Sequence, residues 1–322
     1  MRRLDDPYHR ISPELDSGYL QVADGHRLYW EESGNPERLP IVLVHGGPGG
    51  SNAAGYRAFI DSERFRIIQF DQRGCGRSEP KGLLASNSLQ STLADMELLR
   101  QHFDIERWIV AGGSWGSTVA LAYGEAYPQR CLGLLLVSLW LCRKQDIHWW
   151  YQGLETFFPE LWEQFAAKVP ASERHNLCSA YSRGILQGED QVLADKLATQ
   201  LFLYEEGFMR FDAPLAPPDL ANAATYGRIF SHFSSQGFFL RENQLLEEAH
   251  RIADLPVVLI SGRYDMCTPP NNAYALRQQL HNAELIIVPG AGHNPTELAL
   301  ARVLVQGCSK LIARMDLSNC EV

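Results

Sequence analysis

The 322-residue sequence lacks several patterns, and each absence excludes a class of protein. No apolar run approaches the ~20 residues that a transmembrane helix requires, so we expect no membrane partner. Lysine and arginine are not clustered and the net charge is −9. This argues against a nucleic-acid partner, because phosphates must be neutralised by grouped cations. No Gly-x-x-x-x-Gly-Lys-Ser/Thr loop is present to bind a nucleotide phosphate.

Two further patterns are missing: paired cysteines, and an apolar run near the first residues. The seven cysteines are scattered without a Cys-x-x-Cys pair. This disfavours a disulfide framework and a zinc site, and it predicts free thiols. The first residues include two arginines with no apolar run behind them, so we expect no secretion signal. These absences together predict a cytoplasmic protein, and nothing in the sequence specifies its oligomeric state.

The sequence does contain short apolar runs that alternate with helical patterns. Hydrophobic residues make up 45% of the chain, which is enough to bury a sizeable core. Residues 18–33 alternate around Asp24-Gly25 and predict a hairpin. A helix is expected directly after residues 107–114, and it should end before Pro128. Continuous apolar runs, typical of strands buried on both faces, occupy residues 40–47, 65–74, 107–114, 131–140, 255–265 and 283–293.

Buried strands that alternate with helices predict an α/β fold with a mostly parallel central sheet and helices on both faces. The alternation stops between residues 141 and 240, where aromatic and helical patterns follow each other. We interpret residues 141–240 as an inserted helical cap domain and residues 1–140 and 241–322 as the α/β core. Reactive groups in such sheets gather after the carboxyl ends of strands. The segments "HGG", "GGSWGS", "GRYD" and "GAGH" all occupy that position.

The segment "GGSWGS" contains the Gly-x-Ser-x-Gly pattern of a nucleophile elbow, formed by Gly112, Ser114 and Gly116. In such an elbow the serine occupies a strained turn between a strand and a helix. Glycines flank it because side chains at so tight a bend would collide with the neighbouring elements. The pattern also occurs by chance, but an apolar strand precedes it here and an alanine-rich helix follows. We therefore predict that Ser114 is a catalytic nucleophile.

A serine hydroxyl needs a base to remove its proton, and the base needs an orienting group. His293 follows a strand and a glycine loop, and Asp265 ends the preceding strand. Hydrolases with this elbow use the same chain order of Ser, Asp and His. We predict these three residues as a catalytic triad that requires no cofactor and no metal. The amides of Trp115 and of Gly47, in "HGGPGG", are the predicted oxyanion-hole donors.

Several segments together resemble the α/β-hydrolase fold, and specifically the prolyl aminopeptidases, also called proline iminopeptidases. They are "HGGPGG", "DQRGCGRS", "GGSWGSTVALAYGEAYP", "SGRYDMCTPP" and "VPGAGHNP". The segment "RKQDIHWWYQGLETFFPELWEQF" is similar too, so the resemblance extends from about residue 11 to residue 310. It implies that Ser114, Asp265 and His293 form the triad. The implied reaction releases an N-terminal residue, preferably proline, from small peptides through an acyl-enzyme.

An aminopeptidase must recognise a charged amine, and a partly desolvated carboxylate does so more strongly than one in water. The family carries a Trp-Glu pair on a cap helix that corresponds to "LYEEG" here. The resemblance therefore implies Glu205 as the amine-binding residue and Glu206 as its alternative, unless both are exposed helix charges. Trp140, Trp150 and Tyr151 could stack on a proline ring, although such aromatic clusters more often form the core of a cap.

Two positions depart from the family pattern. Phe230 stands where a second glutamate is usual, and Val137-Ser138 stand where Arg-Gly is common. Both changes make the predicted pocket more apolar. The leading hypothesis is a serine aminopeptidase that prefers N-terminal proline. The alternative is a related hydrolase of small esters or amides without strict proline specificity.

A third hypothesis, a non-catalytic binding protein on a hydrolase scaffold, is disfavoured by the complete set of triad residues. Cys75 and Cys267 lie near the catalytic motifs, so thiol reagents are candidate inhibitors. The sequence identifies no base partner for either thiol, which favours a structural role.

Overall fold

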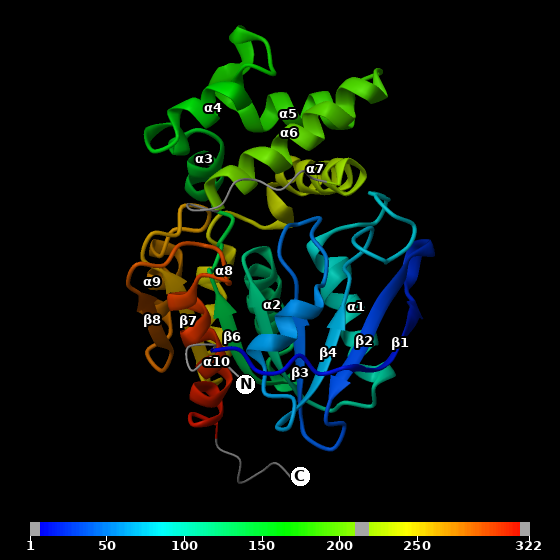
Figure 1. Ribbon diagram of the computed structural model, residues 1–322, viewed down its shortest axis with the longest axis vertical. Helices are drawn as coiled ribbons and strands as arrows, with labels where there is room; N and C mark the ends of the chain where they lie inside the picture. Colours follow the sequence, from blue (N-terminus) through cyan, green and yellow to red (C-terminus); the bar gives the residue numbers. More distant parts are fainter. Residues whose placement is uncertain (1–6, 210–218, 316–322) are drawn as a thin grey trace.

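A central sheet of eight strands organises the molecule (Figure 1). The computed structural model describes residues 7–209 and 219–315. The strand order is β1-β2-β4-β3-β5-β6-β7-β8. Strands β3 to β8 run parallel to one another, whereas β1 and β2 are antiparallel to their neighbours. The strands are β1 (Glu14–Gln21), β2 (Arg27–Gly34), β3 (Leu39–Val44), β4 (Phe65–Phe70), β5 (Trp108–Gly113), β6 (Cys131–Val137), β7 (Val257–Gly262) and β8 (Glu284–Val288).

These strands confirm the predicted α/β fold and its mostly parallel sheet. The hairpin predicted around Asp24-Gly25 is formed by β1 and β2, and both turn residues have positive φ, 61° and 79°. The six continuous apolar runs form β3 to β8. The helix expected after β5 is α2 (Trp115–Ala126), and it ends before Pro128 as predicted.

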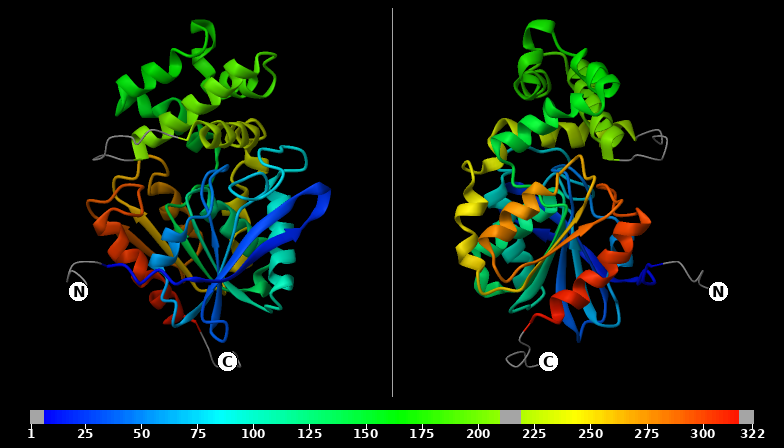
Figure 2. Two further views of the ribbon diagram at one scale, coloured as in Figure 1. Left: turned by 45° about the vertical axis from the view of Figure 1, so that its right-hand side comes forward. Right: turned by 90° about the vertical axis from the view of Figure 1, so that its left-hand side faces the viewer.

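Helices cover the two faces of the sheet unequally (Figure 2). One face packs against α1 (Leu89–His102), α2, α8 (Gln244–Glu247) and α9 (Asn271–Gln279). The opposite face packs against α10 (Leu298–Ile312) and the short 3-10 helix η2 (Ala54–Phe59). Strand residues alternate between these cores, so that Val42 and Val44 belong to the first and Ile41 and Leu43 to the second.

The larger part of the segment between β6 and β7 forms a helical layer over one end of the sheet (Figure 1). Its helices are α3 (Lys144–Tyr151), α4 (Pro159–Ala166), α5 (Leu177–Leu186), α6 (Gln191–Met209) and α7 (Leu220–Ser235). Stacked rings hold the layer together; the Phe165 ring centroid lies 4.1 Å from those of both Tyr181 and Tyr204. The division into a cap of residues 141–240 and a two-part core stays a prediction.

Within the described ranges, no helix combines the length and the apolar character needed to cross a bilayer.

Candidate active site

Ser114 occupies the turn between β5 and α2, at the carboxyl edge of the sheet. Its backbone has φ 56° and ψ −128°, a conformation that non-glycine residues rarely adopt and that costs roughly 1–3 kcal/mol. The Ser114 amide donates a hydrogen bond of 3.0 Å to the Val137 carbonyl on β6, and its own carbonyl accepts from Ser117. The surrounding elements therefore fix the strained turn from both sides.

Close backbone contacts explain the two glycines of the elbow. A Cβ atom at Gly112 would lie 2.0 Å from the Gly116 carbonyl oxygen. A Cβ atom at Gly116 would lie 2.1 Å from the Val44 carbonyl oxygen, so that α2 could not approach β3. Side chains at both positions are thus excluded by collision, as the sequence pattern indicated.

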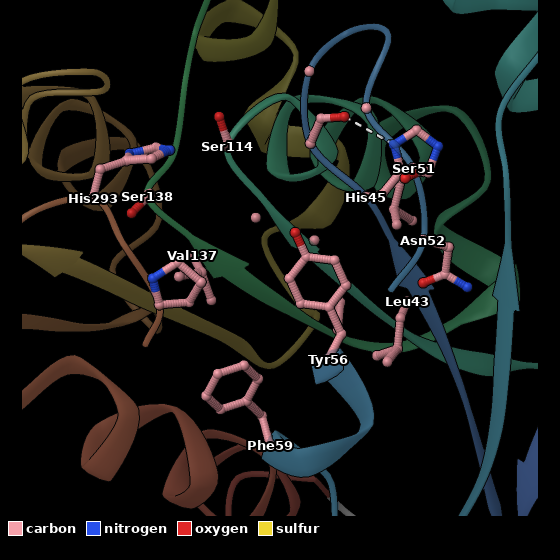
Figure 3. Close-up of a pocket in the computed structure, with 18 of the residues that line it drawn as sticks. Leu43, His45, Ser51, Asn52, Tyr56, Phe59, Ser114, Val137, Ser138 and His293 are labelled. Carbon is pink, nitrogen blue, oxygen red and sulfur yellow. Dashed lines mark hydrogen bonds between the residues drawn. The ribbon is translucent and has the colours of Figure 1, made fainter. Parts of the chain in front are cut away.

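His293 and Asp265 form a buried pair at the same edge of the sheet. The His293 Nδ1 atom lies 2.9 Å from each carboxylate oxygen of Asp265. Thr268 holds the carboxylate in place, because its amide donates to Oδ1 over 2.8 Å and its hydroxyl donates to Oδ2 over 3.0 Å. With Nδ1 facing the carboxylate, the Nε2 atom of His293 is left to face the cavity. Figure 3 shows the His293 ring and Ser114 at the same end of that cavity.

The electrostatic surroundings favour a protonated His293. Burial lowers the pKa of His293, whereas the charge of Asp265 and its hydrogen bond raise that pKa. The carboxylates of Glu205 and Glu297 raise the pKa further, so that it lies above its ordinary value of 6.5. The carboxylates around His293 therefore stabilise the imidazolium that forms when its ring accepts a proton.

The glycine loop after β3 is anchored by residues that the sequence analysis did not single out. The His45 Nε2 atom accepts a hydrogen bond of 3.0 Å from the Gln72 amide, and His45 Nδ1 donates to the Gly46 carbonyl over 2.8 Å (Figure 3). Burial lowers the pKa of His45 despite the nearby charge of Asp71, which keeps this ring neutral. Gln72 belongs to the segment "DQRGCGRS", which supports the family resemblance. The sequence of this segment did not indicate that Gln72 binds His45.

Of the predicted oxyanion donors, Gly47 lines the same cavity as Ser114, and Trp115 follows Ser114 directly in the chain. Gly47 has φ 123°, and a Cβ atom there would lie 2.6 Å from the amide nitrogens of Gly49 and Gly50. Trp115 is the first residue of α2, whose amide has no acceptor within its own helix. The Trp115 indole donates a hydrogen bond of 2.9 Å to the Gln72 side chain, which connects the elbow to the glycine loop.

A cavity of about 310 Å³ connects Ser114 and His293 with the helical layer. Glu205 and Glu206 of α6 and Tyr226 of α7 line its upper end. Glu205 is only 5% exposed, and its carboxylate accepts a hydrogen bond from the Tyr226 hydroxyl. Burial raises the pKa of Glu205 to about 7, although the Tyr226 hydrogen bond and the charge of His293 lower it. The Glu205 carboxylate is therefore not an exposed helix charge. Its described hydrogen bonds come from Tyr226 and Cys267, and neither of these side chains is a cation.

The structure does not bring the three predicted aromatic residues to the cavity wall. Trp140, Trp150 and Tyr151 are buried in the main core, and none of them lines the described cavity. Phe230 lies among the same rings, with its centroid 4.9 Å from that of Trp150 and 6.2 Å from that of Trp140. This placement agrees with the alternative in which the aromatic cluster forms the core of the cap.

The cysteines near the site are buried and unpaired. All six cysteines in the described ranges are free, as predicted. Cys267 Sγ lies 3.7 Å from the Glu205 carboxylate, and burial raises the pKa of both the Cys267 and the Cys75 thiols. Neither side chain lines the cavity, and thiols with raised pKa values are poor nucleophiles.

Known proteins resemble this chain in sequence over almost its full length. Residues 40–299 match the family described as the alpha/beta hydrolase fold. A probable proline iminopeptidase of Leptolyngbya boryana is 40% identical, and the match covers 98% of each chain. The proline iminopeptidase of Neisseria gonorrhoeae is 36% identical over 98% of this chain and 100% of its own.

Solved structures resemble the fold at much lower identity. MGS-M2, an alpha/beta hydrolase enzyme from a Medee basin deep-sea metagenome library, superimposes with a TM-score of 0.62 at 15% identity. The match covers 95% of this chain and 100% of that one. At this identity the likeness concerns the fold alone.

Proposed function

Because this chain belongs to the alpha/beta hydrolase family, and within it to the proline iminopeptidases, we propose that it releases N-terminal proline from small peptides. The observation that carries the proposal is a cavity lined by two kinds of groups. Ser114 and His293 line it, and so does the buried carboxylate of Glu205. The first pair suits acyl transfer and the second suits a free amine.

The proposed reaction begins with attack of Ser114 Oγ on the carbonyl carbon of the N-terminal residue. His293 takes the hydroxyl proton at Nε2 while Asp265 holds the ring and stabilises its positive charge. The amides of Gly47 and Trp115 donate to the oxyanion, and one such donor contributes roughly 3 kcal/mol to lowering the barrier. His293 then protonates the leaving amine as the C–N bond breaks. Water hydrolyses the resulting acyl-enzyme by the same route, which releases the N-terminal residue and restores Ser114.

Glu205 is proposed to bind the substrate ammonium group. Its carboxylate is buried beside the Tyr226 hydroxyl, so a bound cation would compensate the charge that burial disfavours. Glu205 on α6 and Ser114 line the same cavity, so an ammonium group held by Glu205 would keep the N-terminal residue beside the nucleophile. Glu206, on the same cavity wall, is the alternative anchor.

Hydrolysis of small esters or amides without strict proline specificity is the second candidate function. The observation in its favour is Phe230, which is 1% exposed within the aromatic cluster and supplies no carboxylate to the cavity. The anchoring of the amine then depends on α6 alone.

Three substrates distinguish the two functions. We expect prolyl p-nitroanilide to be cleaved with a much higher kcat/KM than its N-acetylated form, because acetylation removes the charge that Glu205 would bind. A simple p-nitrophenyl ester measures the acyl-transfer machinery alone. Equal kcat/KM values for the free and the acetylated anilides would refute release of an N-terminal residue and favour the second function.

A further inference from the structure

The catalytic cavity has a second branch that the proposed recognition of the amine does not use. It extends from Ser114 along the sheet face that α10 and η2 cover, away from Glu205. Figure 3 shows Leu43, Tyr56, Phe59 and Val137 grouped on this side of Ser114. We call this branch the apolar arm and define it by Leu43, Phe59, Ala111, Leu135, Val137 and Leu304.

The arm follows from strand periodicity and from the thin cover of this face. Ala111 on β5 and Leu135 and Val137 on β6 point to the same side of the sheet, because alternate residues of a strand share a face. The cover above them is the six-residue helix η2 together with α10. Ala111 and Gly113 are the β5 residues on this face beside the elbow, and their small size leaves space that larger side chains would fill.

The chemistry of the arm suits an uncharged, apolar group. The side chains that define it are all apolar, so a charged group placed there would lose its hydration without gaining a partner. Uncharged polar groups of Tyr56 and Asn52 stand beside these side chains (Figure 3). The Ser138 hydroxyl, which also lines the cavity, is buried, and no described residue accepts a hydrogen bond from it or donates one to it. An unpartnered hydroxyl beside the reacting groups is available to a peptide group of the substrate.

The residues on the two sides of the scissile bond must occupy different parts of the cavity. The N-terminal residue joins the carbonyl carbon that Ser114 attacks, and its ammonium group has to reach Glu205. The leaving amine must therefore extend in another direction while it remains close enough to His293 to receive a proton. Figure 3 shows Val137, which belongs to the arm, on the same side of the cavity as Ser138 and His293.

We propose that the apolar arm binds the side chain of the residue that follows the scissile bond, and that the enzyme prefers peptides with a large apolar residue there. This inference rests on the proposed release of an N-terminal residue and adds the specificity for the leaving group. Burial of a leucine or phenylalanine side chain in the arm should raise kcat/KM by about 10- to 100-fold over glycine.

The test uses prolyl dipeptide amides that differ only in the second residue: glycine, aspartate, leucine or phenylalanine. Terminal amides remove the carboxylate charge from the comparison. We expect leucine and phenylalanine to exceed glycine by the factor above, and aspartate to fall below glycine. Val137→Phe fills the arm and should bring the ratio of phenylalanine to glycine close to one. Gln306→Phe adds the same ring to the exposed side of α10 and should leave the ratio as in the wild type.

A variant with the opposite effect covers the case in which Val137→Phe does not fold. Phe59→Ala widens the arm, so we expect it to favour a prolyl-tryptophan amide over the phenylalanine one. Equal kcat/KM values for the four amides would overturn the proposal while prolyl release itself stands. A dependence on the size of the N-terminal residue instead would also overturn it, because the arm would then hold the acyl side. Cleavage of the p-nitrophenyl ester without cleavage of any free-amine substrate would refute the proposed function, and the arm assignment with it.

Discussion

Replacement of Glu205 by glutamine tests the amine anchor most directly. Glutamine has nearly the same shape and can still accept the hydrogen bond from the Tyr226 hydroxyl, so the change removes a charge and little else. The pKa of Glu205 is raised from 4.5 to about 7, which corresponds to roughly 3 kcal/mol of penalty on the buried charge. A bound ammonium group recovers much of that penalty, and in the variant it would face a neutral amide.

The loss of one partner from a buried charge pair typically costs roughly 2–5 kcal/mol. For Glu205→Gln we therefore expect kcat/KM on prolyl p-nitroanilide to fall by about 30- to 5,000-fold at pH 7.5. Hydrolysis of p-nitrophenyl acetate, which has no amine, should change less than about threefold, within the usual spread for a single contact. The ratio of the two substrates is the quantity to measure.

A pH profile adds a readout that a purely structural role would not change. The Glu205 carboxylate raises the pKa of His293. Removal of this charge lowers the His293 pKa, so the acid limb of the ester profile should move to lower pH. Glu206→Gln distinguishes the two neighbouring glutamates of α6. A larger fall in kcat/KM for Glu206→Gln than for Glu205→Gln would make Glu206 the anchor. Glu163→Gln neutralises an exposed carboxylate of α4 and serves as the matched control. An equal fall for anilide and ester in Glu205→Gln would refute the anchor.

Three further outcomes follow from the geometry. Ser114→Ala should abolish both hydrolysis and labelling by a fluorophosphonate, and labelling of the variant at wild-type level would disprove the assignment of the nucleophile. In the wild type, kcat/KM should fall as pH decreases through the pKa of His293, which lies above 6.5, because only the neutral ring accepts a proton; a rate that is flat from pH 8 to pH 5 would contradict this role. Gly116→Ala should lower the free energy of unfolding by about 2–3 kcal/mol, since the new Cβ would lie 2.1 Å from the Val44 carbonyl oxygen. Thermal unfolding measures this loss. Gly55→Ala is the control and should be close to neutral, because a Cβ at Gly55 meets no atom within 4 Å.

The sequence predicted those parts of the molecule that depend on local patterns. Continuous apolar runs indicated every parallel strand, because a strand buried on both faces consists mostly of apolar residues. The elbow was local in part, since Gly112 is required by a contact with Gly116 in the same turn, whereas Gly116 is required by the carbonyl of Val44 on β3. The pairing of His293 with Asp265 followed from the rule that parallel strands end at one edge.

The parts that the sequence did not predict depend on contacts between distant segments. An apolar ring is equally suited to a cavity wall and to a core, and the packing of α3 against the other helices decides that Trp150 belongs to the core. The role of Thr268 requires knowledge of where the Asp265 carboxylate points. The apolar arm exists because η2 is short and Ala111 is small. The sequence does not indicate that these two features lie together and leave a cavity.

The position of the helical layer between two neighbouring strands has a consequence for the kinetics of folding. Leu134 on β6 is in register with Val257 on β7, although the whole of α3 to α7 separates them along the chain. Contacts between residues so far apart are slow to form, because a long loop must close before the pairing stabilises it. Asp265 and His293 follow β7 and β8, so they join Ser114 only after this closure. Recovery of turnover during refolding should therefore lag behind the recovery of helical circular dichroism, and enzymatic activity is the stricter criterion of the native state.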